Sequence, residues 1–105
     1  MLGKLFEMPV FSTIDTATVA LDKIIESCLG IQFSDDYSRK GQRYRSRVNN
    51  YADHFVARCR VFRDKHEVES DEYEEWNDLM TKCLHEKEAM VETKKDIRSI
   101  GVFVQ

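Results

Sequence analysis

The sequence has few of the residues that interrupt helices. Only four glycines and one proline occur in 105 residues. Because both residues disfavour helix interiors and are common in strand-and-turn folds, their scarcity favours long helices. Apolar residues make up 42% of the chain and charged residues 33%, which fits one domain with a thin core. We therefore predict a single all-α domain over residues 1–105.

Long apolar runs are also missing. No stretch approaches the roughly 20 apolar residues that cross a bilayer, so we expect no membrane span and at most a peripheral association with a membrane complex. The initial MLGKLFEMPVF lacks an arginine-rich amphipathic pattern and a small-residue cleavage site. We expect no removable targeting peptide, which leaves the compartment open.

Cysteine is scarce and odd in number. Cys28, Cys59 and Cys83 lie far apart, each among apolar positions of a helical pattern. This predicts three buried thiols in a reducing compartment. With the three histidines they form no CxxC, no HxxxH and no i, i+4 ligand pair, and no glycine-rich segment offers a phosphate cradle. We expect no metal, no cofactor and no catalytic residue.

Apolar residues recur at steps of three and four in three segments, each preceded by a serine. The first helix is predicted over about 13–29, with Ser12 as N-cap and Gly30 as its stop. The second is predicted over about 34–66, with Ser34 as N-cap and two aspartates next to it, whose charges suit the positive end of the helix dipole.

The third helix is predicted over about 70–100, between Ser70 as N-cap and Gly101 as stop. Its apolar positions form a continuous heptad seam that weakens at two lysines. The seam comprises Tyr73, Trp76, Met80, Cys83, Lys87, Met90, Lys94 and Ile97.

A short connection joins the second and third helices, so they are expected to form a long antiparallel hairpin. Residues 1–33, 34–66 and 67–105 carry net charges of −2, +5 and −6. Opposite charges are therefore expected to meet where the basic end of the second helix faces the acidic start of the third. The residues concerned are Arg58, Arg60, Arg63 and Lys65 on one side and 67–78 on the other.

The start of the second helix is rich in arginine. Five basic residues lie within nine positions, with Tyr37 before them and Tyr44 among them; they are Arg39, Lys40, Arg43, Arg45 and Arg47. This pattern could grip phosphates while the tyrosines stack on bases, which makes an RNA-binding module one alternative. The tyrosines fall on the apolar stripe and the chain as a whole is acidic, so protein docking or internal ion pairing is the preferred interpretation.

Both ends of the chain are apolar. We predict extended apolar segments there that dock onto a partner, because exposed apolar residues have no other evident use. The candidates are Phe6, Val10, Phe11, Val102, Phe103 and Val104.

The layout resembles a known family, the small helical accessory subunit of the matrix arm of mitochondrial respiratory complex I (alpha-subcomplex subunit five). The similar stretches are the apolar segment 3–10, LDKIIESCLGI at 21–31, Tyr37 in SDDYSRK, and the acid-rich start of the last helix at 72–90. The resemblance implies a structural role, a location on the matrix side of the inner membrane, and no cofactor.

Together these features lead us to expect a non-catalytic accessory subunit that contacts other protein subunits of a large assembly, most plausibly that of complex I. A cytoplasmic location is the alternative if the resemblance does not hold. Two other functions stay open: an RNA-binding helical module, and a coiled-coil adaptor that associates with its own copy through the seam of the third helix.

Overall fold

The computed structural model describes the backbone of residues 10–104 and the side chains of residues 10–91. Three helices follow one another: α1 (Ile14–Gln32), α2 (Arg39–Arg63) and α3 (Asp71–Val104). No strand occurs among the described residues. The predicted all-α class is confirmed.

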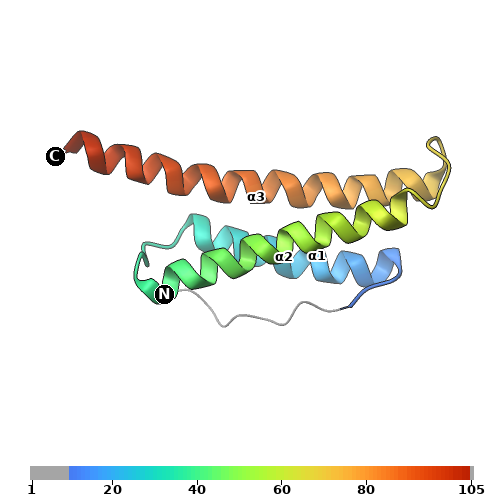
Figure 1. Ribbon diagram of the computed structural model, residues 1–105, viewed down its shortest axis with the longest axis horizontal. Coiled ribbons are helices and arrows are strands. Elements are labelled where there is room, and N and C mark those ends of the chain that lie inside the picture. Colours follow the sequence, from blue (N-terminus) through green and yellow to red (C-terminus); the bar gives the residue numbers. More distant parts are fainter. Residues whose placement is uncertain (1–9, 105) are drawn as a thin grey trace.

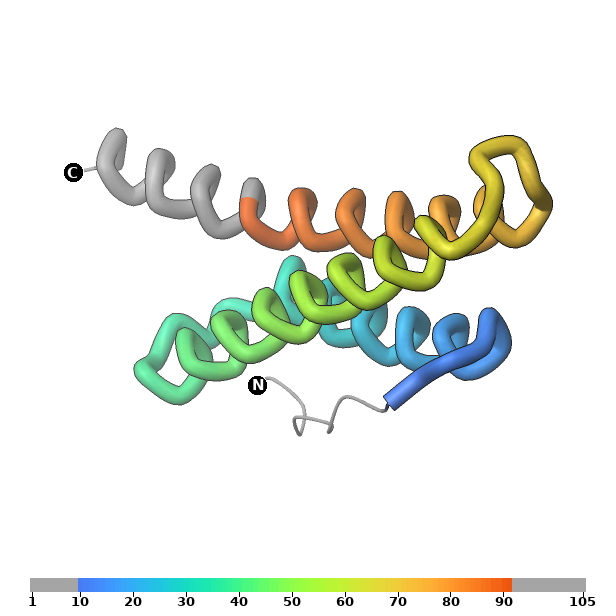
Figure 2. The backbone as a smooth tube through the Cα atoms, turned by 45° about the vertical axis from the view of Figure 1, so that its right-hand side comes forward, coloured from blue at the N-terminus to red at the C-terminus, as the bar shows by residue number. Residues whose placement is uncertain are grey.

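Helix α3 makes most of the contacts between the helices. It packs against both α1 and α2, whereas α1 and α2 contact each other only sparsely. Both lie along one side of α3, and α2 runs antiparallel to it (Figures 1 and 2). Near its C-terminal end α2 lies close to α3, and it diverges from α3 toward Arg39. The three-helix bundle with an antiparallel hairpin is therefore confirmed, and the first half of α2 stands away from α3.

One apolar core joins the three helices. Its members recur at the three- and four-residue steps that place them on one face of each helix. They include Ala17, Leu21, Ile24, Cys28 and Ile31 of α1, Val48, Ala52, Phe55 and Cys59 of α2, and Trp76, Met80, Cys83 and Met90 of α3. Four members of the predicted heptad seam, Trp76, Met80, Cys83 and Met90, are thus buried inside the chain, whereas Tyr73 and Lys87 are half-buried.

The ends of α1 differ from the prediction by one to three residues. Thr13, not Ser12, is the N-cap: its side chain accepts a hydrogen bond from the Thr16 amide at 3.2 Å, and the Thr16 hydroxyl accepts from the Thr13 amide at 3.2 Å. At the other end Gly30 does not stop the helix. Ile31 continues the buried stripe, so packing extends α1 beyond the glycine to Gln32.

The start of α2 was also predicted wrongly. Ser38, not Ser34, is the N-cap, and its hydroxyl accepts from the Gly41 amide at 3.2 Å. Residues 34–38 form a turn in which Ser34 accepts from the Asp36 amide at 3.1 Å. The buried guanidinium of Arg45 holds this turn, because it donates to the backbone oxygens of Asp36 and Ser34. A tertiary contact therefore selects one serine cap over the other.

Of the three remaining predicted helix ends, one is confirmed and two are wrong. α2 ends at Arg63, three residues before the predicted end. Ser70 does cap α3, because its hydroxyl accepts from the Tyr73 amide at 3.2 Å. Gly101 does not end α3, which continues as a helix to Val104, so the segment after Gly101 is not extended as predicted.

Two glycines lie inside helices, and we expect opposite effects when each is replaced by alanine. Around Gly30 nothing lies within 4 Å of an added Cβ atom, whereas at Gly41 that atom would collide with the backbone oxygen of Asp36. Gly30→Ala should raise the free energy of unfolding by about 1 kcal/mol, because alanine favours the helix. Gly41→Ala should lower it, because the turn must shift. Thermal melts of the two variants measure this, and a stabilised Gly41→Ala would contradict the tight turn.

Candidate docking surface

The prediction that Phe11 is an exposed docking residue is wrong, because Phe11 is part of the core. Only 1% of its surface is exposed. Its ring centroid lies 5.1 Å from that of Phe55 and 6.3 Å from those of Phe62 and Trp76. Arg58 Nε donates to the Phe11 backbone oxygen at 3.0 Å. These contacts fix the chain just before α1 against α2 and α3.

The other terminal candidates have different outcomes. Val10 is 85% exposed, and its docking role stays a prediction. Phe6 lies outside the described residues, and the side chains of Val102, Phe103 and Val104 lie outside the described side chains. Their proposed docking role stays a prediction.

Arg39, Arg43 and Arg47 are exposed on the outer side of α2, together with Lys40. Their spacing places them on one face over the first half of the helix. We call these four residues the basic face. It lies on the part of α2 that diverges from α3 (Figure 1), so α3 does not cover it.

The charges of this face are not neutralised within the described side chains. The two ion pairs there join Arg63 to Asp64 at 3.1 Å and Lys87 to Asp53. Within α2 the only acid is Asp53, against eight lysines and arginines. None of the four cations of the basic face therefore has an ion-pair partner among the described side chains.

The predicted ion pairing between the end of α2 and the start of α3 is wrong. Arg63 instead donates to Asn77 Oδ1 at 2.9 Å and lies over the Tyr73 ring, 5.2 Å from its centroid. Lys65 lies 5.0 Å from the centre of the Phe62 ring. Opposite net charges do not pair the end of α2 with the start of α3, because the acids at 71, 72, 74, 75 and 78 are exposed, most of them on the side of α3 away from its packed face.

The acids at the start of α3 thus form a second charged surface, which the sequence assigned to internal pairing. Asp71, Glu74, Glu75 and Asp78 are all exposed. At steps of three, four and seven they share one face of the helix. We call them the acidic face. The alternation of apolar and acidic positions in residues 71–80 could have shown that they face away from the core.

The two tyrosines of this segment both contact other residues of the chain, although Tyr37 is 38% exposed. Tyr44 packs against the core. Tyr37 lies before α2, and the Arg45 guanidinium stands 4.4 Å from its ring centre. Arg45 itself is buried, so one of the five clustered bases holds the fold together. An exposed aromatic that the sequence did not nominate is Phe33, which follows α1 and is 86% exposed.

The three cysteines are free and buried, one in each helix. Burial raises the pKa of the Cys28 thiol to about 11, and the nearby Glu86 carboxylate adds to this. Burial also raises the pKa of the Cys59 thiol and of the Cys83 thiol to about 12. The thiols of Cys28 and Cys59 add to the rise at Cys83. Thiols this far from ionising are poor nucleophiles and poor metal ligands at neutral pH.

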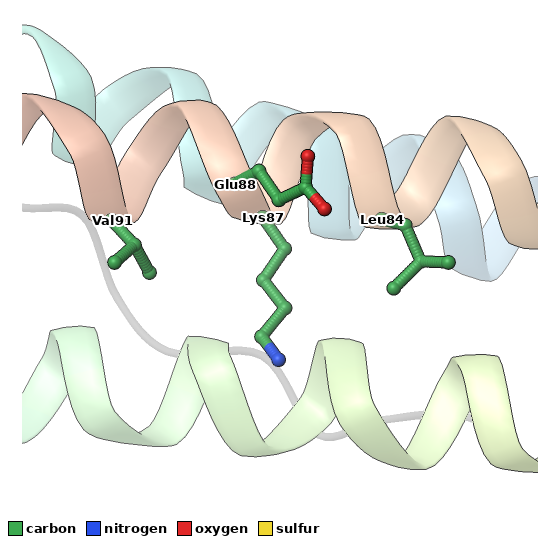
Figure 3. Close-up of a pocket in the computed structure, with 4 residues that line it drawn as sticks. All are labelled: Leu84, Lys87, Glu88 and Val91. Carbon is green, nitrogen blue, oxygen red and sulfur yellow. The ribbon is translucent and has the colours of Figure 1, made fainter.

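A shallow depression of ≈ 340 Å³ lies beside α3 where α2 diverges from it. The described residues that line it belong to α3 and are Leu84, Lys87, Glu88 and Val91, and Figure 3 shows Lys87 reaching across toward α2. There the ammonium pairs with Asp53. Lys87 therefore links the two helices.

Within the described part of the chain no His, Cys, Asp or Glu side chains gather in a group of three that could hold a metal ion. None of the helices there has the length and apolar character needed to cross a membrane.

No protein-family model, curated protein or solved structure matches this chain.

Proposed function

We propose that this chain is a non-catalytic docking subunit of a larger protein assembly and that its basic face binds an acidic surface of a partner protein. The observation that carries the proposal is the set of four exposed cations at the start of α2 for which residues 10–91 supply no ion-pair partner. Arg39 and Lys40 lie in the first turn, where the helix dipole disfavours a cation by about 0.3–1 kcal/mol. An acidic partner would offset this cost.

Repulsion within the face adds to the same cost. Arg39, Arg43 and Arg47 follow one another at i, i+4 steps, and like charges at this spacing destabilise a helix by about 0.2–0.5 kcal/mol per pair. Core packing does not require these charges, because all three side chains are exposed. An acidic partner surface would turn repulsion into attraction and would steer association.

A protein partner fits better than RNA. The two tyrosines nominated for base stacking already have partners within the chain: Tyr44 packs against the core, and the Tyr37 ring, which is 38% exposed, lies against the Arg45 guanidinium. Phe33, which also precedes the basic face in sequence, is the most exposed aromatic ring of the described residues. RNA binding becomes one outcome of the experiment below.

The test compares two charge-matched variants of the tagged full chain in extracts of its native cells. Arg39→Glu/Arg43→Glu/Arg47→Glu reverses the basic face. Arg60→Glu/Lys65→Glu/Lys82→Glu makes the same change in net charge at three exposed positions elsewhere. We expect the first variant to lose its co-purifying proteins by about tenfold or more, and the control to retain them.

Equal recovery by both variants would overturn the proposal. A nuclease-treated sample distinguishes protein binding from RNA binding. If the co-purifying proteins are lost after nuclease treatment, the basic face binds RNA.

We further propose that the assembly is the matrix arm of respiratory complex I, on the matrix side of the mitochondrial inner membrane. The support is the resemblance of residues 3–10, 21–31 and 72–90 to its small helical accessory subunit. Cell fractionation followed by a native gel should place the chain with mitochondria and in the band that carries complex I activity. A chain found in the cytoplasmic fraction would refute this location.

A further inference from the structure

Ser46 is an exposed serine at the edge of the basic face of α2. It follows Arg43 by three residues and Arg39 by seven, and both steps bring side chains to the same side of a helix. Arg47 comes directly after it. The Ser46 hydroxyl therefore lies beside the arginines to which the proposed function assigns partner binding.

The Ser46 hydroxyl has no hydrogen-bond partner among the described residues. Serine and threonine inside a helix often donate to the backbone oxygen four residues earlier. Thr18, Ser27 and Thr81 all do so, at oxygen–oxygen distances of 2.8, 3.0 and 2.8 Å. Because Ser46 is exposed and unbonded, neither core packing nor hydrogen bonding within residues 10–91 accounts for its hydroxyl, which is free for a covalent modification.

We propose that Ser46 is a phosphorylation site and that its phosphate weakens docking through the basic face. The inference rests on the proposed function of that face and names its regulation. A protein kinase transfers the γ-phosphoryl group of a nucleoside triphosphate to Ser46. The bond from Ser46 Oγ to phosphorus forms, and the bond from the γ-phosphorus to its bridging oxygen breaks. The nucleoside diphosphate leaves, and the hydroxyl proton passes to a carboxylate of the kinase.

The residues around Ser46 indicate the class of kinase. Arg43 stands three residues before the serine, and Arg45 and Arg47 stand on either side of it. No other serine or threonine of the sequence lies between two arginines. Kinases select their substrates by charge pattern, so a kinase with an acidic substrate groove fits this segment.

Local opening at the start of α2 gives the kinase access to Ser46. This half of the helix lies apart from α3 (Figure 1), so it opens while the end of α2 stays packed on α3. Repulsion among Arg39, Arg43 and Arg47 lowers the cost of opening.

The phosphate removes about half of the positive charge of the basic face. It carries about −1.5 to −2 at neutral pH, against the four cations Arg39, Lys40, Arg43 and Arg47. It also accepts charge-assisted hydrogen bonds from guanidinium groups, and Arg43 lies one turn away. The phosphate therefore competes with the acids of a partner for the same groups, and electrostatic steering of the partner weakens.

The first experiment asks whether the folded chain is a substrate. The purified full chain is incubated with ATP and a protein kinase that requires arginine three residues before its serine. Mass spectrometry of the digested chain should find a phosphoryl group on Ser46, and the Arg43→Gln variant should lose most of this modification. A full chain left unmodified on Ser46 by this kinase overturns the inference.

The second experiment compares the phosphorylated and untreated chains in extracts of the native cells with phosphatase inhibitors. We expect phosphorylation to lower the recovery of co-purifying proteins by about tenfold. Ser46→Glu should lower it less, because a carboxylate carries less charge than a phosphate. Ser12→Glu is the matched control, since Ser12 is also exposed with an unbonded hydroxyl and lies at the other end of the bundle from the start of α2 (Figure 1). Its recovery should equal that of the wild type.

Full recovery of partners by the phosphorylated chain overturns the inference, and so does an equal loss with Ser12→Glu and Ser46→Glu. If Arg39→Glu/Arg43→Glu/Arg47→Glu removes the partners but phosphorylation does not, the proposed function stands and only its regulation fails. If neither change removes them, the proposed function fails as well.

Discussion

Phe11→Ala is expected to lower the free energy of unfolding of the purified chain by about 3 kcal/mol, near the lower end for a buried phenylalanine. The Phe11 ring is 1% exposed and lies among Phe55, Phe62 and Trp76. Its removal leaves a cavity between the start of α1 and the hairpin. Small domains are stable by only about 5–15 kcal/mol, so this is a large fraction of the total.

The neighbouring residue supplies the control. Val10 is 85% exposed, and Val10→Ala should change the free energy of unfolding by less than about 0.5 kcal/mol. Urea unfolding followed by circular dichroism measures both variants, with the slope expected to stay constant. If Phe11→Ala were as mild as Val10→Ala, Phe11 would not be a core residue.

Alkaline pH is expected to destabilise the fold through its three buried thiols. Burial raises the folded-state pKa of Cys28 to about 11 and of Cys59 and Cys83 to about 12, from an ordinary value of 9.0. The protonated form is favoured in the folded state, so the thiol contribution to stability is complete below about pH 9 and is lost as the pH rises toward 11–12. At pH 10 the loss is on the order of 1 kcal/mol per thiol.

Cys59→Ala isolates this effect from other groups that titrate in the same range. Burial alone raises the pKa of Cys59. The variant is expected to be less stable than the wild type at pH 8. Between pH 8 and 10, the part of its stability loss that comes from thiol ionisation should be about one third smaller, because two of the three thiols remain. Urea unfolding at several pH values measures the slope. A slope equal to that of the wild type would mean that Cys59 is already ionised or exposed in the folded chain.

The failed ion-pair prediction shows the limit of charge counting. Residues 34–66 are basic and 67–105 are acidic, and the two helices do lie antiparallel. Whether a charge on one helix reaches its neighbour depends on its angle about the helix axis. The apolar seam directs Trp76 and Met80 toward the core and leaves Glu74 and Asp78 exposed on the outer surface. The same rotation leaves the acidic face exposed.

The N-cap of α2 shows a similar limit of local sequence preference. Ser34 and Ser38 are both acceptable N-caps by local preference, and the sequence favours Ser34 because two aspartates follow it. Ser38 is chosen because Arg45, seven residues later, needs the backbone oxygens of Ser34 and Asp36 as acceptors for a buried guanidinium. Burying that charge without these bonds would be costly.

By itself the sequence determined the features that repeat along the chain. Periodic apolar residues and few helix breakers specify three helices, a short connection specifies the antiparallel hairpin, and apolar surroundings place Cys28, Cys59 and Cys83 inside. Only the tertiary structure decided which residues of similar character are core and which are surface. Phe11 is buried and Val10 exposed because one aromatic ring fits the gap beside Phe55 and Trp76, and that gap forms only once the helices have packed.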